Sequence, residues 1–355
     1  MVTREPIWKH EDFPHYYHNP AAVAEIGLAF REELDRLMSL MDGNDMEGGI
    51  SEVLTEETLK NSRIEGVELD RESVRSSFLN NLPIKGSRES GAVAVTRMAL
   101  ENLNEPLGDD LIKQMHQRLF DGSDMPDGQR GAYLGDVRLV SGRRLDQEPV
   151  IEDLGMPRDR VDQAMGEFVA WFNRESDQDP LTKAIQGHLH FEAIHPFADG
   201  NGRIGRALMQ RCVSRDLGRS LPLALSRVFY RDSSLYDRQF KTGLDLTGTI
   251  KELGPVMIEA VKETVTILEV TRMRGVVLNS DLNERQKKVM SRLIHYELSG
   301  KEFEGGLNNR NYRKMTSAEE KTAQRDLRDL VSRKLLLKSG RLKGTRYRIN
   351  IPSKA

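Results

Sequence analysis

Apolar residues recur at three- and four-residue intervals along most of the chain, a spacing typical of helices that bury one face. The pattern predicts helical segments over residues 21–42, 50–64, 67–82, 91–120 and 158–173. The glycines of "MDGNDMEGG" separate the first two, because glycine disfavours a helix interior. We therefore expect a mainly α-helical fold.

The C-terminal stretch has a pattern of its own. "LNERQKKVMSRLIHY" is expected to form a helix that begins at Leu282 or Asn283, and "NNRNYRKMT" a short second helix. "SAEEKTAQRDLRDLVSRK" predicts a third, with Ser317 and Glu320 as its capping box. "LLLKSGRLKGTRYRI" then alternates as a hairpin. Three helices followed by a two-stranded wing resemble a winged helix-turn-helix.

The composition indicates a protein with well-formed hydrophobic cores and no membrane-spanning segment. The chain has 355 residues, which suggests two or three domains; 38% are hydrophobic and 30% charged. Cys212 is the single cysteine, so no intrachain disulfide forms, which fits a reducing compartment. No window approaches the roughly 20 apolar residues that a membrane span needs. We expect a cytoplasmic location.

Charge is distributed unevenly along the chain. Residues 281–355 contain 19 Lys and Arg against 9 Asp and Glu, whereas residues 1–280 contain 34 against 46. The whole chain is nevertheless close to neutral, with a net charge of −2. This division indicates a basic module attached to an acidic remainder.

The stretch "IHPFADGNGRIGR" contains the largest group of candidate functional residues. Gly200-Asn201-Gly202 is a turn signal between two predicted helices, the first running from Pro180 to Ile194. Its backbone N–H groups lie at the start of the second helix, where the helix dipole favours an anion. Arg203 and Arg206 lie on one face of that helix and can clamp a polyphosphate. Asp199 can hold a hard cation, and His195 is placed as a base.

Two other interpretations of this stretch are weaker. A purely structural turn would need the glycines but neither the histidine, the aspartate nor the paired arginines. A metal cluster of His188, His190 and His195 is disfavoured, because residues two apart on a helix project about 200° apart. An anion site with a base therefore fits the stretch best.

From His195 to Arg206 the sequence resembles the signature of the Fic family, HPFx(D/E)GNGRxxR. The resemblance implies a helical enzyme that moves AMP from ATP onto a Ser, Thr or Tyr hydroxyl of a target protein. In that case His195 takes the hydroxyl proton and Asp199 binds Mg²⁺. The amides of Gly200, Asn201 and Gly202 would cradle phosphate, while Arg203 and Arg206 hold the β and γ phosphates.

Further segments match the same family. "LPLALSRVFYRDSSLYDRQF" resembles its next segment, which implies that Tyr236 lies near the nucleotide, although a core aromatic is an equal alternative. "RGAYLGDVRLVSGRR" resembles the family's short hairpin, the flap, whose exposed edge pairs with the backbone of the target segment. Its expected docking residues are Tyr133, Leu134, Gly135, Asp136, Val137, Arg138, Leu139 and Val140.

Glu65-Gly66 raises a separate hypothesis. It resembles the family's inhibitory motif (S/T)xxxE(G/N), in which a glutamate pairs with the second arginine of the nucleotide site, here Arg206. Asn61 stands where the motif has Ser or Thr. The alternative is a helix C-cap at Gly66 with Glu65 in solvent.

The basic tail suggests nucleic acid as a partner. In a winged helix the third helix enters the major groove and the wing meets the backbone. The side chains expected to face bases are Gln324, Arg325 and Arg328, and those expected to meet phosphates are Arg341, Lys343 and Arg346. A winged helix used for protein contacts or for a homodimer is the alternative.

Taken together, the sequence predicts four segments: residues 1–90 as an N-terminal helical domain with the inhibitory helix, 91–255 as a Fic core, 256–280 as a linking helix and 281–355 as the winged helix. The expected function is AMP transfer from ATP with Mg²⁺. A DNA-binding regulator that only senses ATP would not need His195. Removal of AMP from a modified protein, with Glu65 positioning water, stays open.

Overall fold

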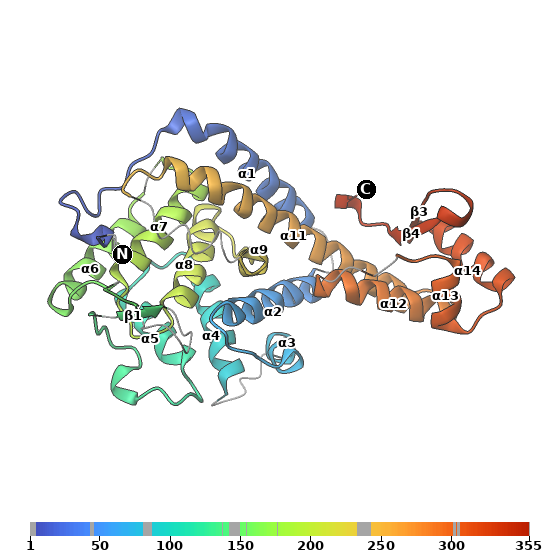
Figure 1. The fold of residues 1–355 in the computed structure, drawn as a ribbon, viewed down its shortest axis with the longest axis horizontal. Helices are drawn as coiled ribbons and strands as arrows, with labels where there is room; N and C mark the ends of the chain where they lie inside the picture. The colour runs from blue at the N-terminus through green and yellow to red at the C-terminus, as the bar shows by residue number, and fades with distance from the viewer. Residues whose placement is uncertain are drawn as a thin grey trace. The chain divides into compact units, whose positions relative to one another are not determined.

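The computed structural model describes residues 5–42, 46–80, 87–136, 138–141, 150–153, 155–175, 177–232, 243–300, 303 and 306–354. The chain is mainly α-helical, as predicted, with two short hairpins (Figure 1). It divides into two compact units. The first contains residues 1–36 and 54–261, and the second contains residues 37–53 and 262–355.

The N-terminal helices form where the periodicity predicts them: α1 (Pro20–Met41), α2 (Glu47–Ile64) and α3 (Arg71–Asn80). α3 begins later than expected, because the Asp70 carboxylate accepts the backbone N–H of Ser73 at 2.8 Å and so caps the helix. Before α1, the chain forms a 3₁₀ turn, η1 (Ile7–Lys9), with Trp8 buried.

The core of the first unit contains α4 (Arg88–Leu100), α5 (Asp109–Leu119), α6 (Arg158–Asn173), α7 (Pro180–Ile194), α8 (Asn201–Asp216) and α9 (Leu225–Arg231), with the short turn η2 (Asp127–Gln129). α7 and α8 pack against each other at its centre, and both are buried on nearly all sides (Figure 1). Asp179 starts α7 by accepting the N–H of Thr182 at 3.0 Å. The two central helices therefore place the loop between them in a fixed frame.

The hairpin predicted in this region forms, but with different bounds. β1 (Arg138–Ser141) pairs antiparallel with β2 (Val150–Asp153), with Arg138 opposite Asp153. The strand does not begin at Tyr133 as expected, because the preceding backbone makes other bonds: Leu134 N–H donates to the carbonyl of Pro196 at 2.9 Å. Val137 lies outside the described residues.

The C-terminal part contains the long helix α11 (Thr247–Asn279) and then α12 (Glu284–Ser299), α13 (Asn309–Thr316), α14 (Glu320–Ser332), β3 (Leu336–Ser339) and β4 (Arg346–Ile349). The turns η4 (Leu342–Gly344) and η5 (Pro352–Lys354) accompany the hairpin. Three helices and a two-stranded antiparallel hairpin follow in the predicted order. The helix expected over residues 256–280 instead begins at Thr247 and contains Pro255.

The predicted capping box of α14 is wrong. Ser317 ends α13 in the left-handed conformation, with φ of 56°, so its side chain is not the N-cap of α14, which is Glu319. The capping box in this unit belongs to α12, where Asn283 and Gln286 exchange hydrogen bonds. The sequence places Asn283 correctly at the start of that helix.

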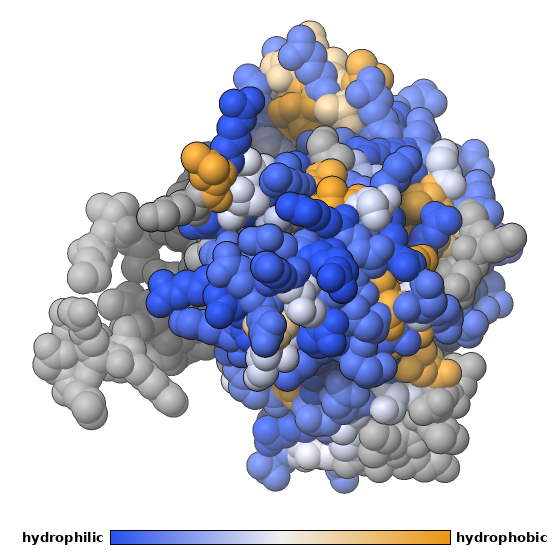
Figure 2. All heavy atoms as spheres, turned by 90° about the vertical axis from the view of Figure 1, so that its right-hand side faces the viewer, coloured by the Kyte–Doolittle hydropathy of each residue, from blue (hydrophilic) through white to orange (hydrophobic). Residues whose placement is uncertain are grey.

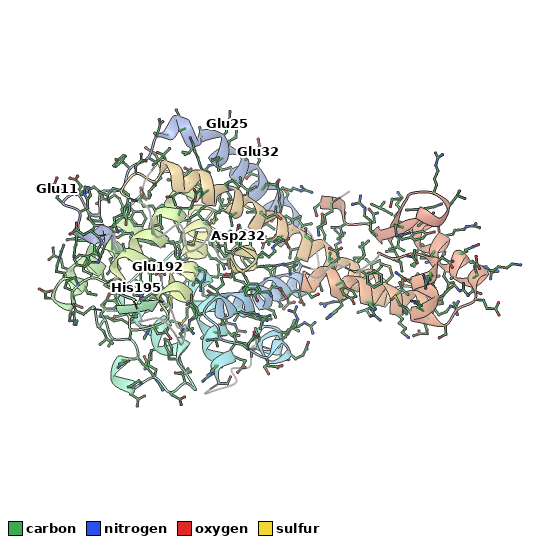
Figure 3. All side chains as sticks on the ribbon, in the orientation of Figure 1. Glu11, Glu25, Glu32, Glu192, His195 and Asp232 are labelled. Atoms are coloured by element: carbon green, nitrogen blue, oxygen red, sulfur yellow. The ribbon has the colours of Figure 1, made fainter. Side chains whose placement is uncertain are left out.

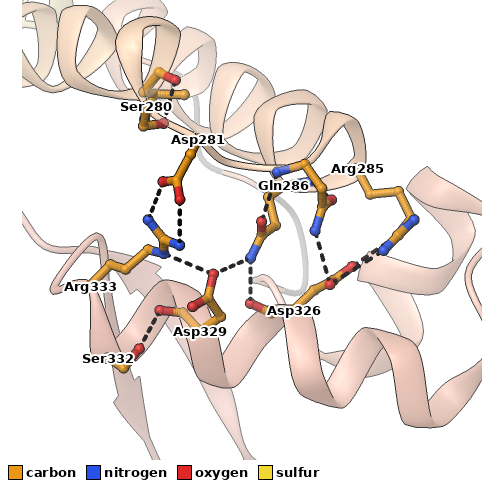
Figure 4. Close-up of polar contacts among 10 residues, drawn as sticks. Ser280, Asp281, Arg285, Gln286, Asp326, Asp329, Ser332 and Arg333 are labelled. Carbon is orange, nitrogen blue, oxygen red and sulfur yellow. Dashed lines mark hydrogen bonds and ion pairs between the residues drawn. The ribbon is translucent and has the colours of Figure 1, made fainter.

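Asp326 joins the three helices of the C-terminal unit. Its carboxylate accepts from Arg285 Nε at 2.9 Å, from Asn283 at 3.1 Å and from the Tyr312 hydroxyl at 2.9 Å. Gln286 adds a bond to Asp329 at 2.8 Å (Figure 4). Because the carboxylate is 5% exposed, losing a partner would leave a buried charge unsatisfied. This network fixes α14 against α12 and α13.

The surface of the described residues is mostly polar where Figure 2 shows it, with hydrophobic residues in small groups. Among the described helices, none has the length and apolar character to cross a bilayer.

Candidate active site

His195 ends α7 in a strained but fixed conformation. It adopts the left-handed region with φ of 50°, and its N–H donates to the carbonyl of Phe191 at 3.0 Å. Its Nδ1 lies 3.4 Å from a carboxylate oxygen of Glu192, one turn earlier on the helix (Figure 3). With Nδ1 directed to the carboxylate, Nε2 is the nitrogen available for a proton.

The Glu192 carboxylate also sets the pKa of His195. Burial lowers the pKa of the imidazole, but hydrogen bonding to Glu192 and its charge raise it, and the net pKa lies above the ordinary value of 6.5. Burial alone would raise the pKa of Glu192, yet the same pairing with His195 leaves it lowered. The pair therefore forms an oriented, basic imidazole.

The loop after His195 is held by side chains on both sides. Asn201 donates to the carbonyl of Phe197 at 2.7 Å and accepts its N–H at 3.0 Å. His116 stacks on the Phe197 ring with centroids 3.9 Å apart and planes 9° apart. The Asn201 side chain thus braces the loop, while the role predicted for its backbone amide, phosphate binding, stays a prediction.

His116 contacts this loop as a neutral imidazole. Its Nδ1 accepts the N–H of Gly131 at 2.8 Å, so its Nε2 must carry the proton and donate to the carbonyl of Asp199 at 3.1 Å. Burial lowers the pKa of His116 to about 4, which keeps this tautomer at neutral pH. The carbonyl of Asp199 is therefore fixed by a residue of α5.

Gly200 and Asp199 form the start of α8. Gly200 has φ of 86°, and a Cβ there would lie 2.8 Å from the Leu119 side chain, so any larger residue would be strained. The Asp199 carboxylate is 58% exposed, accepts the N–H of Gly200 at 2.6 Å and lies 3.1 Å from the Arg203 guanidinium. The Asp199 carboxylate is therefore an exposed acidic group next to the N-terminus of α8.

The two arginines of the motif differ in their surroundings. Arg203 lies over the Phe120 ring, 5.0 Å from its centroid, and its Nε is buried without a hydrogen-bond partner among the described residues. Arg206 is fully buried; its Nε donates to the Asn61 side chain at 2.6 Å and one terminal nitrogen donates to the Asn61 carbonyl at 3.1 Å. Positive charge is therefore concentrated at the α8 N-terminus.

Glu65 reaches this positive charge. Its carboxylate accepts from Arg206 at 2.8 Å, as the sequence proposed, although 141 residues separate the two. A Cβ on Gly202 would lie 2.5 Å from the same carboxylate oxygen, so the absence of a side chain there makes room for Glu65. Glu65 thus sits over the first turn of α8, where an anion would bind.

A cavity of about 380 Å³ adjoins the site. Asp199, Arg203 and Phe120 line it together with Ser62 and Arg88. The cavity gives the α8 N-terminus room for a ligand larger than one phosphate group.

The histidines upstream form no metal cluster. Among the described residues no group of three or more His, Cys, Asp or Glu side chains could hold an ion. His190 is buried among aromatic rings, including Phe168 at 5.2 Å, and burial lowers its pKa to about 3. His188 contacts the start of α8 instead, where a Cβ on Gly205 would lie 2.7 Å from its Nδ1.

Several predicted site residues are placed differently or not at all. Tyr133 is buried and donates to Asp109 at 2.5 Å, so its side chain belongs to the core rather than to a docking edge. Tyr236 and the side chains of Arg138, Leu139, Val140 and Lys343 lie outside the described residues. Gln324, Arg325, Arg328, Arg341 and Arg346 are all exposed, as a binding surface requires.

Sequence reasoning missed Glu192 and His116. Glu192 stands one helical turn before His195, a spacing that could have indicated the pair. His116 is 83 residues from Asp199, and its sequence environment gives no sign of the contact.

Two parts of the chain are similar to known protein families. Residues 106–213 match the model of the Fic/DOC family, and residues 7–84 match a domain of unknown function, DUF4172. A probable protein adenylyltransferase of Aquifex aeolicus is 31% identical over 117 residues, which are 32% of this chain and 32% of that protein. A protein adenylyltransferase of Caenorhabditis elegans is 30% identical over 168 residues, 43% of this chain and 30% of that protein.

The chain spans about a third of the length of these curated relatives. A solved structure of a Fic family protein from Desulfovibrio desulfuricans is 19% identical, with a TM-score of 0.48 over 95% of this chain and 98% of that one. The region that matches the Fic/DOC family model, residues 106–213, includes His195 and the first turns of α8, so the site described above lies within this similarity.

Proposed function

We propose that the chain is a protein adenylyltransferase that moves AMP from ATP onto a Ser, Thr or Tyr hydroxyl of a target protein. The observation that carries this proposal is the imidazole of His195, oriented by Glu192 at 3.4 Å, beside a helix N-terminus that bears Arg203 and Arg206. The names of the curated relatives support AMP transfer as the reaction type. A regulator that only senses ATP would need phosphate ligands but no oriented base.

In this mechanism the target hydroxyl attacks the α phosphorus of ATP while His195 Nε2 takes the hydroxyl proton. The bond between the α phosphorus and the bridging oxygen breaks, and pyrophosphate leaves. Arg203 and Arg206 neutralise the charge of the leaving phosphates, and the α8 N–H groups bind phosphate oxygens. Asn201 and His116 keep the loop in place during the step.

The residues fit a magnesium ion delivered with the nucleotide. Mg²⁺ commonly uses one or two carboxylates together with substrate phosphates and water, and Asp199 offers one exposed carboxylate at the mouth of the site. When bound, the ion would neutralise phosphate charge. Asp199 would hold it, with its backbone fixed by His116.

The flap would present the target. Within the described residues β1 pairs only with β2, so its other edge is available to a strand of the target through backbone hydrogen bonds. This role rests on the backbone of residues 138–141 and not on Tyr133.

Glu65 would inhibit the enzyme by occupying the anion position. One guanidinium nitrogen cannot donate the same hydrogen to the Glu65 carboxylate and to the γ phosphate. ATP that binds while Glu65 is in place is therefore held in a pose unsuited to in-line attack. The contact between Glu65 and Arg206 at 2.8 Å supports this role.

The test compares Glu65→Gly with Glu68→Gly, an exposed glutamate that pairs with Arg63 at 2.9 Å and does not contact the site. With labelled ATP and Mg²⁺, Glu65→Gly should raise AMP incorporation into target and self, Glu68→Gly should not, and adding His195→Ala should remove the gain. Equal rates for the parent and Glu65→Gly would refute inhibition. A fall in rate, with loss of AMP removal from a premodified target, would favour the reverse reaction.

The second function that we propose is binding of duplex DNA by residues 281–355, read as a winged helix. Gln324, Arg325 and Arg328 share the exposed face of α14; Arg341 is exposed between β3 and β4, and Arg346 is exposed at the start of β4. The network around Asp326 keeps α14 fixed for entry into a groove. Protein contacts and homodimerisation are the competing uses, and the cytoplasmic location stays a prediction.

A charge-matched pair tests DNA binding in the full-length chain. Arg325→Glu with Arg328→Glu should abolish the gel shift of duplex DNA at low salt, because both side chains are exposed on α14. Lys288→Glu with Arg292→Glu, exposed on α12, should change it little. A parent chain that shifts no DNA at low salt would favour the protein-contact use.

A further inference from the structure

Three polar side chains spaced four residues apart contact α8 and α9: Glu57 and Asn61 on α2, and Glu65 directly after its end. We propose that Asn61 is a positioning residue that orients Arg206 for ATP in the catalytic state, and that α2 stays seated when Glu65 releases. The proposal rests on the function proposed above. Activation is then a side-chain movement of Glu65 and not a displacement of the helix.

Asn61 makes three hydrogen bonds to α8. Its side-chain oxygen accepts from Arg206 Nε at 2.6 Å, its carbonyl accepts from a terminal nitrogen of Arg206 at 3.1 Å, and its side-chain nitrogen donates to the carbonyl of Arg203 at 3.1 Å. Arg206 is fully buried and Asn61 is 7% exposed, so water cannot replace these bonds. Asn61 fixes the plane of the guanidinium independently of Glu65.

Asparagine can make this set of contacts because its acceptor oxygen and donor nitrogen are separate atoms at the end of the side chain. The residue usual in the inhibitory motif, Ser or Thr, has a single hydroxyl oxygen that both donates and accepts, and it is shorter than asparagine. The departure at Asn61 therefore adds a bond to the backbone of α8 as well as one to Arg206.

Further contacts of α2 are also buried. Glu57 accepts from Ser226 N–H at 2.7 Å and from its hydroxyl at 2.6 Å, and the hydroxyls of Thr58 and Thr96 lie 2.9 Å apart. Glu56 adds an ion pair with Arg227 at 3.2 Å. Lifting α2 would break all of these contacts together with those of Asn61.

Glu65, in contrast, follows the last residue of α2 and is 31% exposed. The terminal nitrogen of Arg206 that it contacts carries two hydrogens, one directed to Asn61 and the other to Glu65. When Glu65 rotates away, a γ-phosphate oxygen can take its hydrogen while the two Asn61 contacts persist. A single contact is exchanged, and the guanidinium keeps its orientation.

The first experiment measures nucleotide affinity, so it does not depend on turnover. In a chain carrying Glu65→Gly and His195→Ala, Asn61→Ala should raise the Kd of ATP about 10-fold, the effect of losing one hydrogen bond to a charged group. The Kd of AMP, which lacks the γ phosphate, should not change. Thr58→Val is the matched control, since it removes a buried polar contact of α2 that does not touch Arg206, and both affinities should stay at their original values.

The second experiment cross-links α2 to α4 with a disulfide bond, so that α2 cannot move away. Cysteines at Thr58 and Thr96 would place sulfurs near the hydroxyl positions, which are 2.9 Å apart, so a shift of about 1 Å brings them to the disulfide length of about 2.05 Å. The chain's own Cys212 is buried and does not compete. In the Glu65→Gly background, oxidised and reduced forms of this one protein should transfer AMP with the same kcat and the same KM for ATP.

The outcomes separate the two levels of the proposal. An ATP affinity unchanged by Asn61→Ala would overturn the positioning role of Asn61. A transfer activity that is lost on oxidation and regained on reduction would overturn the claim that α2 stays in place. Parallel weakening of ATP and AMP would overturn it too, because it would show a general distortion of the site. A Glu65→Gly chain that binds ATP with the predicted Asn61 dependence but transfers no AMP would refute the proposed function alone.

Discussion

Replacing Glu192 with glutamine tests whether the buried carboxylate makes His195 an effective base. The change keeps the size of the side chain and removes its charge 3.4 Å from Nδ1. Glutamine can present an oxygen or an amide group to the ring, so it no longer enforces the tautomer with a free Nε2. We therefore expect both the rate and its pH dependence to change.

The magnitude follows from the separation of the charges. At an effective dielectric constant of about 20, an imidazolium and a carboxylate 3.4 Å apart interact with about 5 kcal/mol, and burial of the imidazole opposes part of this. A hydrogen bond to a charged group contributes about 1.5–3 kcal/mol net, which corresponds to a rate loss of about 10- to 100-fold at neutral pH. Nucleotide affinity should change less than the rate, because Asn61 still orients the Arg206 guanidinium, although the charge of Glu192 also interacts with Arg206.

The sign of the pH effect is fixed by the raised pKa of His195. Only the neutral imidazole accepts a proton, so the transfer rate should rise with pH through a midpoint that Glu192 raises; the charge of Glu65 also raises it, and this contribution is absent from both chains in the Glu65→Gly background. Without the carboxylate, burial dominates and lowers the pKa, so Glu192→Gln should move the midpoint to lower pH. The lower plateau rate then reflects the lost orientation and the weaker base.

The assay is the initial rate of labelled AMP incorporation between pH 5.5 and 9 in the Glu65→Gly background, with thermal unfolding measured at each pH. Glu167→Gln is the matched control, since Glu167 lies on the exposed face of α6 and bonds only to Gln163 among the described residues. A Glu192→Gln profile with the same midpoint and plateau as the parent would refute the assignment of Glu192 as the partner that tunes His195.

Three further outcomes are expected. His195→Ala should lower AMP transfer by about 10²–10⁴-fold while ATP still binds by calorimetry, and an unchanged rate would refute the assigned base. Gly200→Ala should lower the free energy of unfolding by about 1–3 kcal/mol in urea titrations, because φ is 86° and the new Cβ would lie 2.8 Å from Leu119. Gly218→Ala is the control: φ is 61° but the new Cβ would have nothing within 4 Å, so the free energy of unfolding should fall by less. Asp326→Ala should abolish DNA binding through loss of the fixed α14, and a melting temperature equal to that of the parent would contradict its role as a buried junction of three helices.

The sequence by itself determined the helices and the position of the loop chemistry. Apolar spacing located α7 and α8, and Pro180 with Asp179 set the start of α7. These features depend on residues that are close in the sequence, so the pattern of apolar and capping residues is enough to predict them. The motif from His195 to Arg206 likewise concentrates a base, a carboxylate and two arginines through local spacing alone.

Tertiary structure decided what surrounds those groups. Whether Glu65 caps a helix in solvent or meets Arg206 depends on a contact across 141 residues, which periodicity does not encode. Asn61 and His116 act through contacts of similar range, and the backbone bond from Leu134 to the Pro196 carbonyl moved the strand start past Tyr133. Local sequence fixes which hydrogen-bonding groups an element presents. Packing fixes which partner each buried group finds, because a buried polar group must be satisfied by whatever the fold brings next to it.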